Sequence, residues 1–155
     1  MQRPLDEHWK AVKRILRYLK GTLDQGLIMQ SSKSLNINAY ADSDWATDYD
    51  DRKSTTGYCI FLGMNPISWC AKKQSTVSRS STEAEFRSLA STASEVMWIQ
   101  SLLSELQVNT NSKTTIWCDN ISAISLTANP VLHSRTKHME LDIYFIREQV
   151  MKDNI

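Results

Sequence analysis

Two acidic strand ends, with a long acidic helix between them along the chain, are the feature that most constrains this fold. The helical pattern opens at residues 78–90 and carries Glu83 and Glu85. An alternating run before it ends at Asp42, and a short apolar run after it ends at Asp119. If the helix packs on a sheet that contains both runs, the carboxylates can meet at one end of that sheet. Carboxylate oxygens gathered in this way are the ligands that divalent Mg²⁺ prefers.

Short apolar or alternating runs predict the strands of this sheet. The tetrapeptide Gly-Met-Asn-Pro at residues 63–66 is typical of a turn, so the runs on either side of it are expected to pair as a hairpin. The run that ends at Asp42 precedes the hairpin, and the run that ends at Asp119 follows the long helix. In full, the predicted strands cover residues 26–30, 35–41, 58–62, 67–70 and 114–118.

Helical spacing of apolar residues predicts four helices, at residues 6–20, 80–107, 120–128 and 134–151. The second would be about 40 Å long, enough to cross a whole sheet. The first carries a basic stripe on a face separate from its apolar one. This stripe is either a solvated surface or a track for nucleic-acid phosphates. Its members are Lys10, Lys13, Arg14, Arg17 and Lys20.

Composition restricts the class of protein. The 155 residues are 41% hydrophobic and 23% charged, which predicts a folded globular chain. The net charge of +1 means that any nucleic-acid contact must come from local basic patches. No apolar run approaches the ~20 residues that span a membrane. Three cysteines without a CxxC spacing indicate an intracellular, reducing compartment, either cytoplasm or nucleus, and are expected to be small core residues.

The order strand, hairpin, helix, strand allows Asp42 and Asp119 to lie side by side with Glu85 facing them. Such carboxylates repel one another and stay ionised at low cost only with a cation between them. Two Mg²⁺ ions about 4 Å apart can then promote phosphodiester cleavage. Each acid also has a simpler interpretation, which the spacing leaves open: Asp42 as a turn residue, Glu85 as the capping partner of Thr82, and Asp119 as a helix cap.

Several long motifs carry a resemblance to a known family. In order they are EHWKAVKRILRYLKGTL, AYADSDWATDYDDRKSTTGYCIFLG, ISWCAKKQSTVSRSSTEAEFRSLA, IWCDNISAISLTANPVLHSRTKHMELD and YFIRE. Together they resemble the ribonuclease H region of copia-type retrotransposon polyproteins, and the first resembles the segment that joins it to the reverse transcriptase. The resemblance implies a basic helix and connector at residues 1–33 and a ribonuclease H-like domain at residues 34–155.

The resemblance implies an α/β ribonuclease H-like fold. Its mixed sheet would contain three antiparallel strands, one to three, and a parallel fourth strand, with helices packed on the sheet. It implies cleavage of the RNA strand of RNA–DNA hybrids with Mg²⁺ or Mn²⁺, two ions in the full family site. The catalytic metal ligands would be Asp42, Glu85 rather than Glu83, and Asp119. Asp44 is a weaker candidate.

This sequence departs from the family in its C-terminal part. The family's fourth acid follows a fifth strand, and neither is present here in that form, so the fold is expected to be truncated. Asp142 and Glu140 are the nearest substitutes, and Tyr144 stands where the family usually has histidine. The strands would then lie in the order three-two-one-four. The fourth would be an open edge at residues 113–118, available for self-association or a protein partner.

Groups near the proposed ligands are expected to bind the substrate. Hydroxyl and amide groups can contact ribose 2′-hydroxyls, and basic groups can contact phosphates. The predicted set is Ser78, Arg79, Ser80, Ser81, Thr82, Asn120, Lys72 and Lys73. Two functions remain open: a metal-dependent nuclease, or a weak or inactive ribonuclease H-like module that binds nucleic acid or a protein.

Overall fold

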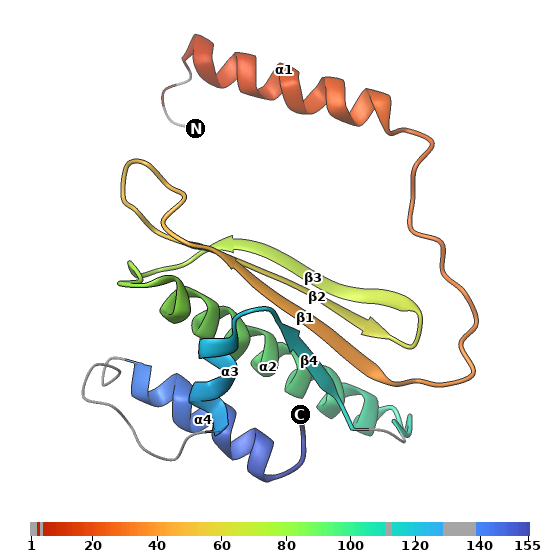
Figure 1. Cartoon of the computed structure of the whole chain (residues 1–155). Coiled ribbons are helices and arrows are strands. Elements are labelled where there is room, and N and C mark those ends of the chain that lie inside the picture. The colour runs from red at the N-terminus through yellow and green to blue at the C-terminus, as the bar shows by residue number, and fades with distance from the viewer. Residues whose placement is uncertain (1–2, 4, 111–112, 129–138) are drawn as a thin grey trace.

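The structure is a computed structural model that describes residues 3, 5–110, 113–128 and 139–155. Its elements follow one another as shown in Figure 1. They are α1 (Asp6–Gly21), β1 (Ile37–Asp44), β2 (Thr55–Leu62), β3 (Asn65–Lys73), α2 (Ser81–Glu105), β4 (Thr115–Cys118), α3 (Ile121–Ala128) and α4 (Glu140–Met151).

The four strands form one mixed sheet in the order β3-β2-β1-β4. β1 pairs antiparallel with β2, and β2 pairs antiparallel with β3. β4 pairs parallel with β1, with Ala41 opposite Cys118. This arrangement confirms the predicted fold class and strand order. Two parallel strands that are neighbours in a sheet must be joined by a crossover connection. Helix α2 is part of the connection that leads to β4.

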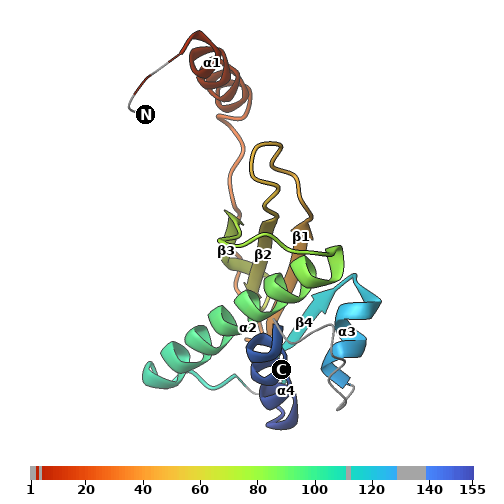
Figure 2. The same ribbon diagram turned by 90° about the vertical axis from the view of Figure 1, so that its left-hand side faces the viewer.

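Three helices cover one face of the sheet. α2 lies against β1 and β2, and α3 and α4 pack beside it on the same side, as Figures 1 and 2 show. Phe86 of α2 is fully buried together with Ile143 and Ile146 of α4. A second buried cluster joins Ile37 and Ile60 of the sheet to the later part of α2.

The opposite face of the sheet is rich in exposed aromatic side chains. Trp69 of β3 is 61% exposed and Trp117 of β4 is 56% exposed. Tyr40 packs edge to face on Phe61, with their ring centroids 5.8 Å apart. Helix α1 lies on this side of the sheet in Figure 1, joined by an extended segment, and none of its residues is buried. No helix of the described residues is both long and apolar enough to cross a membrane.

The predicted strand at residues 26–30 was wrong, because that segment is irregular. The backbone N–H and C=O of Gln30 both bond to the side-chain amide of Asn65, each at 2.8 Å. One side chain therefore satisfies the groups that a neighbouring strand would otherwise satisfy.

Strands β1 to β3 extend further than their apolar runs. β1 continues through Asp42 to Asp44, β2 begins at Thr55, and β3 continues to Lys73. The added residues pair with one another, for example Asp44 with Thr55 and Thr55 with Lys73. The predicted start of the last helix, at residue 134, lies outside the described residues, and α4 is described from Glu140.

A serine hydroxyl ties α2 to the sheet. Ser88 is fully buried, and its Oγ lies 2.6 Å from the carbonyl oxygen of Asp42 and 3.1 Å from that of Gly57. Asp42 and Gly57 are paired across β1 and β2. The hydroxyl therefore fixes the position of α2 beneath the acidic end of β1.

We expect Ser88→Ala to lower the free energy of unfolding by about 1–2 kcal/mol, because two part-buried carbonyl oxygens lose the hydroxyl donor that they share. Urea unfolding followed by circular dichroism measures the change. Ser94→Ala is the matched control, since Ser94 is exposed on the same helix, and it should change stability by less than about 0.5 kcal/mol. Equal effects of the two substitutions would contradict the role assigned to Ser88.

Candidate metal centre

Three elements bring three acidic residues to one end of the sheet. Asp42 lies in β1, and Asp119 directly follows β4. Because Ala41 and Cys118 are opposite each other in the parallel pair, Asp42 and Asp119 occupy neighbouring positions. Glu85 lies about one turn into α2, three residues before Ser88 and therefore on the same side of the helix. The bond from Ser88 to the Asp42 carbonyl oxygen turns this side towards the strand ends.

Glu85 is the buried member of this group, with 7% of its surface exposed, whereas Asp42 and Asp119 are exposed. Among the described residues its Oε2 atom is buried and accepts no hydrogen bond. Burial raises the pKa of Glu85 to about 7, and the negative charges of Asp42 and Asp119 add to the rise. The backbone N–H of Ser43 opposes it, and the Asp44 carboxylate raises the pKa further. The Glu85 carboxylate therefore needs either a proton or a cation.

The donor set fits a divalent cation. Ligand atoms from Glu85, Asp119 and Cys118, one from each, all lie within 4.8 Å of one another. Among the described residues Asp42 is not part of this close group. It contributes its charge to Glu85 from the adjacent strand, and with Asp119 it lines an open groove that also includes Tyr40 and Trp117. Carboxylate oxygens with open positions beside them suit Mg²⁺ and Mn²⁺.

The structure does not bring Asp142 to this cluster. Asp142 is half-buried on α4, where burial raises its pKa and the nearby Arg87 guanidinium lowers it. Arg87 pairs with Glu83, with Nη2 2.7 Å from Oε1. Glu83 is thus buried in an ion pair, on a different side of α2 from the three acids. Glu140 is exposed at the start of α4.

Several of the predicted substrate groups already make local hydrogen bonds. The buried hydroxyl of Ser78 donates to Gln74 Oε1 at 2.9 Å. Ser80 Oγ accepts from the Glu83 N–H at the start of α2, and Asn120 Oδ1 accepts from the Ala123 N–H at the start of α3. These side chains stabilise the segments that carry Glu85 and Asp119.

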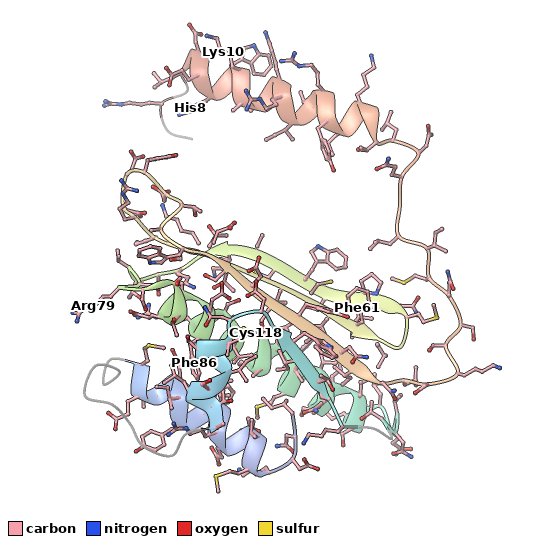
Figure 3. The ribbon with its side chains drawn as sticks, viewed as in Figure 1. His8, Lys10, Phe61, Arg79, Phe86 and Cys118 are labelled. Carbon is pink, nitrogen blue, oxygen red and sulfur yellow. The ribbon has the colours of Figure 1, made fainter. Side chains whose placement is uncertain are left out.

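The predicted basic groups differ in how free they are to reach a substrate. Lys73 Nζ lies 2.5 Å from Asp48 Oδ2 and 3.0 Å from Asp51 Oδ2. Lys73 is therefore held in ion pairs with the acidic loop after β1. Lys72 and Arg79 are exposed, and Arg79 extends away from the body of the molecule in Figure 3. Of the remaining hydroxyl residues, Ser81 is exposed and Thr82 is half-buried.

The sequence reasoning missed two residues of this region, Ser88 and Cys118. Ser88 lies three residues after Glu85 and therefore on the same side of the helix. This spacing could have identified Ser88 from the sequence. Cys118 directly precedes Asp119, but a thiol at the end of an apolar strand is typical of a core residue. In the structure all three cysteines are free and half-buried, and Cys118 lies where β4 leads to α3 (Figure 3).

Comparisons with known proteins identify relatives of this chain. The retrovirus-related Pol polyprotein from transposon RE2 of Arabidopsis thaliana is 55% identical over 150 residues, which are 97% of this chain and 10% of that polyprotein. The corresponding polyprotein from transposon RE1 of the same plant is 53% identical over 150 residues, again 97% of this chain and 10% of that polyprotein. The chain belongs to the copia-type family of transposon Pol polyproteins. It spans about a tenth of the length of these relatives.

A solved structure shares the fold of this Pol segment. It is the N-terminal RNase H domain of a Mycobacterium tuberculosis protein, solved as a fusion with maltose-binding protein. It superposes with a TM-score of 0.52 at 10% identity, covering 75% of this chain and 76% of that one. The likeness confirms the ribonuclease H-like fold. No protein-family model matches the Pol segment.

The raised pKa of Glu85 predicts how stability depends on pH without metal. The unfolded chain loses the Glu85 proton near pH 4.5, whereas the folded chain keeps it up to about pH 7. The folded state therefore loses stability as the pH rises through this window, and the full loss is present above it. For this group we expect a loss of about 2–3 kcal/mol between about pH 5 and pH 8 in EDTA.

Urea unfolding at the two pH values measures this loss. Glu85→Gln should remove this part of the pH dependence, and saturating Mg²⁺ should restore stability to the parent chain at the higher pH. Glu140→Gln is the control, because Glu140 is exposed, and it should keep the parent's dependence. If Glu85→Gln also kept the pH dependence of the parent chain, Glu85 would not be the group that causes the loss of stability.

Proposed function

We propose that this Pol segment is a divalent-metal-dependent endonuclease of the ribonuclease H type, which cleaves the RNA strand of RNA–DNA hybrids. The observation that carries the proposal is the buried Glu85 Oε2 atom, which accepts no hydrogen bond from the described residues and faces the charges of Asp42 and Asp119. A buried carboxylate oxygen without a donor is costly unless a cation pairs with it. The ribonuclease H-like fold and the Pol relatives support the same interpretation.

Asp42, Glu85 and Asp119 would hold the metal, Mg²⁺ or Mn²⁺. When bound, such ions lower the pKa of a water molecule and neutralise charge on the leaving oxygen of a phosphodiester. The chain's own contribution is to keep three carboxylates together and to limit water at Glu85 by packing α2 on the sheet. Ser88 and the local bonds of Ser80 and Asn120 hold these acids in place.

The exposed polar groups around the start of α2 would position the hybrid. Lys72 and Arg79 are free to meet phosphates, and Ser81 is free to meet ribose hydroxyls. Thr82 could join them from its half-buried position. Ser78, Ser80, Asn120 and Lys73 would act mainly by shaping the site, since each already makes a hydrogen bond or ion pair. We further propose that residues 1–33 form a separate basic connector, with residues 34–155 as the domain.

We expect the parent chain to hydrolyse RNA in RNA–DNA hybrids, faster with Mn²⁺ than with Mg²⁺, because Mn²⁺ tolerates a less complete ligand set. Asp42→Asn, Glu85→Gln and Asp119→Asn should each lower the rate by at least on the order of 100-fold, since each removes a ligand charge. A gel assay on a hybrid with a labelled RNA strand measures the rates.

Glu83→Gln is the matched control for Glu85→Gln and should keep most of the activity. Glu83 lies outside the cluster. A glutamine oxygen can still accept the Arg79 N–H that Glu83 Oε2 accepts at 2.8 Å, but the charge that pairs with Arg87 is lost, so thermal unfolding is used to show that this variant is folded. Cleavage that persisted in Asp119→Asn would refute the metal assignment. A folded parent chain that cleaved with neither metal would favour the second function, a non-catalytic binding module.

One observation favours a binding role through the sheet edge. β4 is the last strand in the order β3-β2-β1-β4, so its outer backbone groups have no strand partner among the described residues. Thr115 and Trp117 of this strand are exposed. We propose that residues 113–118 pair with the same edge of a second copy, because an open apolar edge is a template for strand addition.

We expect the chain to dimerise as its concentration rises in analytical ultracentrifugation. Trp117→Lys should weaken the dimer at least about tenfold, because a charged edge opposes pairing. Trp69→Lys is the matched control, since Trp69 is equally exposed on the opposite edge strand, β3. A chain that remained monomeric at all concentrations, or a dimer weakened only by Trp69→Lys, would refute pairing through β4.

A further inference from the structure

A thiol lies among the acids of the proposed metal centre. Cys118 Sγ lies within 4.8 Å of one carboxylate oxygen of Glu85 and of one of Asp119. Cys118 is the last residue of β4, and the parallel pairing with Ala41 fixes its place beside the acidic end of β1. The cysteine is free and half-buried.

An independent observation points to a cation at this position. Glu85 is 93% buried, as its 7% exposure shows, and Oε2 accepts no hydrogen bond from the described residues. This oxygen belongs to the same side chain that supplies the ligand atom near Cys118 and Asp119. The three ligands therefore converge on one place, from α2, β4 and the turn after β4.

We propose that Cys118, Glu85 and Asp119 form a mixed sulfur and oxygen site for thiophilic divalent cations, Zn²⁺ or Cd²⁺, which overlaps the proposed Mg²⁺ site and competes with it. The inference rests on the proposed function only for the identity of the ion that is displaced. When the ion binds, a sulfur–metal bond forms, the S–H bond breaks, and the proton goes to the solvent. No oxidant or reductant is needed.

The ligand geometry suits Zn²⁺ better than Mg²⁺. Zn²⁺ takes four ligands in a tetrahedron, with sulfur at about 2.3 Å and oxygen at about 2.0–2.2 Å. Ligand atoms in such a site are about 3.3–3.7 Å apart, so atoms within 4.8 Å of one another need to approach by no more than about 1.5 Å. Three protein ligands leave the fourth position to water. Mg²⁺ requires six oxygen ligands in an octahedron, and the soft sulfur has no favourable role there.

The consequence is an unusual metal preference for a site of carboxylates. Carboxylates alone discriminate weakly between Mg²⁺ and Mn²⁺, whereas one thiolate favours Zn²⁺ and Cd²⁺ strongly. An ion held by Cys118 would take Glu85 and Asp119 away from the ions that hydrolysis requires. Trace Zn²⁺ would therefore inhibit this chain, and replacing Cys118 would relieve the inhibition while leaving the three acids in place.

Titration of the metal-free chain with Cd²⁺, without any added thiol, tests the proposal. The readout is the ultraviolet charge-transfer absorption of a thiolate–Cd²⁺ bond, which carboxylates do not produce. We expect this band to saturate at one equivalent in the parent chain. Cys118→Ser should lose the band and bind Cd²⁺ at least about tenfold more weakly. Mg²⁺ affinity, measured by calorimetry, should change less than about twofold in the same variant.

Cys59→Ser is the matched control, because Cys59 is also a free, half-buried strand cysteine but lies outside the cluster. It should keep the band and the Cd²⁺ affinity of the parent. Cys118→Ala provides a second variant, and thermal unfolding shows that the variants are folded. A band that survived in either Cys118 variant, or that disappeared in Cys59→Ser, would overturn the proposal.

The two proposals fail in different ways. A saturable band that depends on Cys118, in a chain without hybrid cleavage, would support the thiophilic site and refute the nuclease. Cleavage that requires Glu85 and Asp119, in a chain without a Cd²⁺ band, would support the nuclease and refute the thiophilic site.

Discussion

The burial of one carboxylate between a helix and two strand ends is the constraint on which this structure depends. Glu85 is removed from water by the packing of α2 on the sheet, and its nearest charged neighbours, Asp42 and Asp119, are also negative. Ionised, this group opposes folding, and only a proton or a cation removes the penalty. An ion bound between such acids would stabilise the fold.

The parallel pairing of β1 with β4 makes this arrangement possible. Two parallel strands end at the same edge of a sheet, and the long connection between them must cross one face. Here α2 forms part of that crossover, so its first turns pass directly beneath the two strand ends (Figure 1). The acids are 34 or more residues apart along the chain, and the topology alone brings them together.

The apolar periods of the sequence predicted the main elements, and the resemblance to the copia-type family predicted how the strands pair. It predicted less well where backbone groups bond to polar side chains. Residues 26–30 have an apolar pattern, but the Asn65 amide satisfies Gln30 and no strand forms. The polar ends of β1 to β3 lack an apolar signal, and cross-strand pairs such as Asp44 with Thr55 still extend the ladder.

The sequence marks the positions of the candidate acids to a similar extent. Asp119 directly follows β4 and Glu85 lies near the start of α2, whereas Asp42 lies within β1, two residues before its end. Residue type could not show that Ser78 and Asn120 each make a hydrogen bond within the chain. Cys118 packs against the core, as predicted, and residue type could not show that its sulfur also lies near Glu85 and Asp119.

The distance between α2 and the sheet depends on small residues rather than on the acids. After Ile37, which packs on the later part of α2, the side chains of β1 that face the helix are Ala39, Ala41 and Ser43, all buried. On α2, Ala84 is fully buried beside Glu85, and the small Ser88 side chain reaches two sheet carbonyl groups. Larger side chains at these positions would move the helix away and admit water to Glu85. The electrostatics of the site are therefore set by close packing of residues that carry no charge.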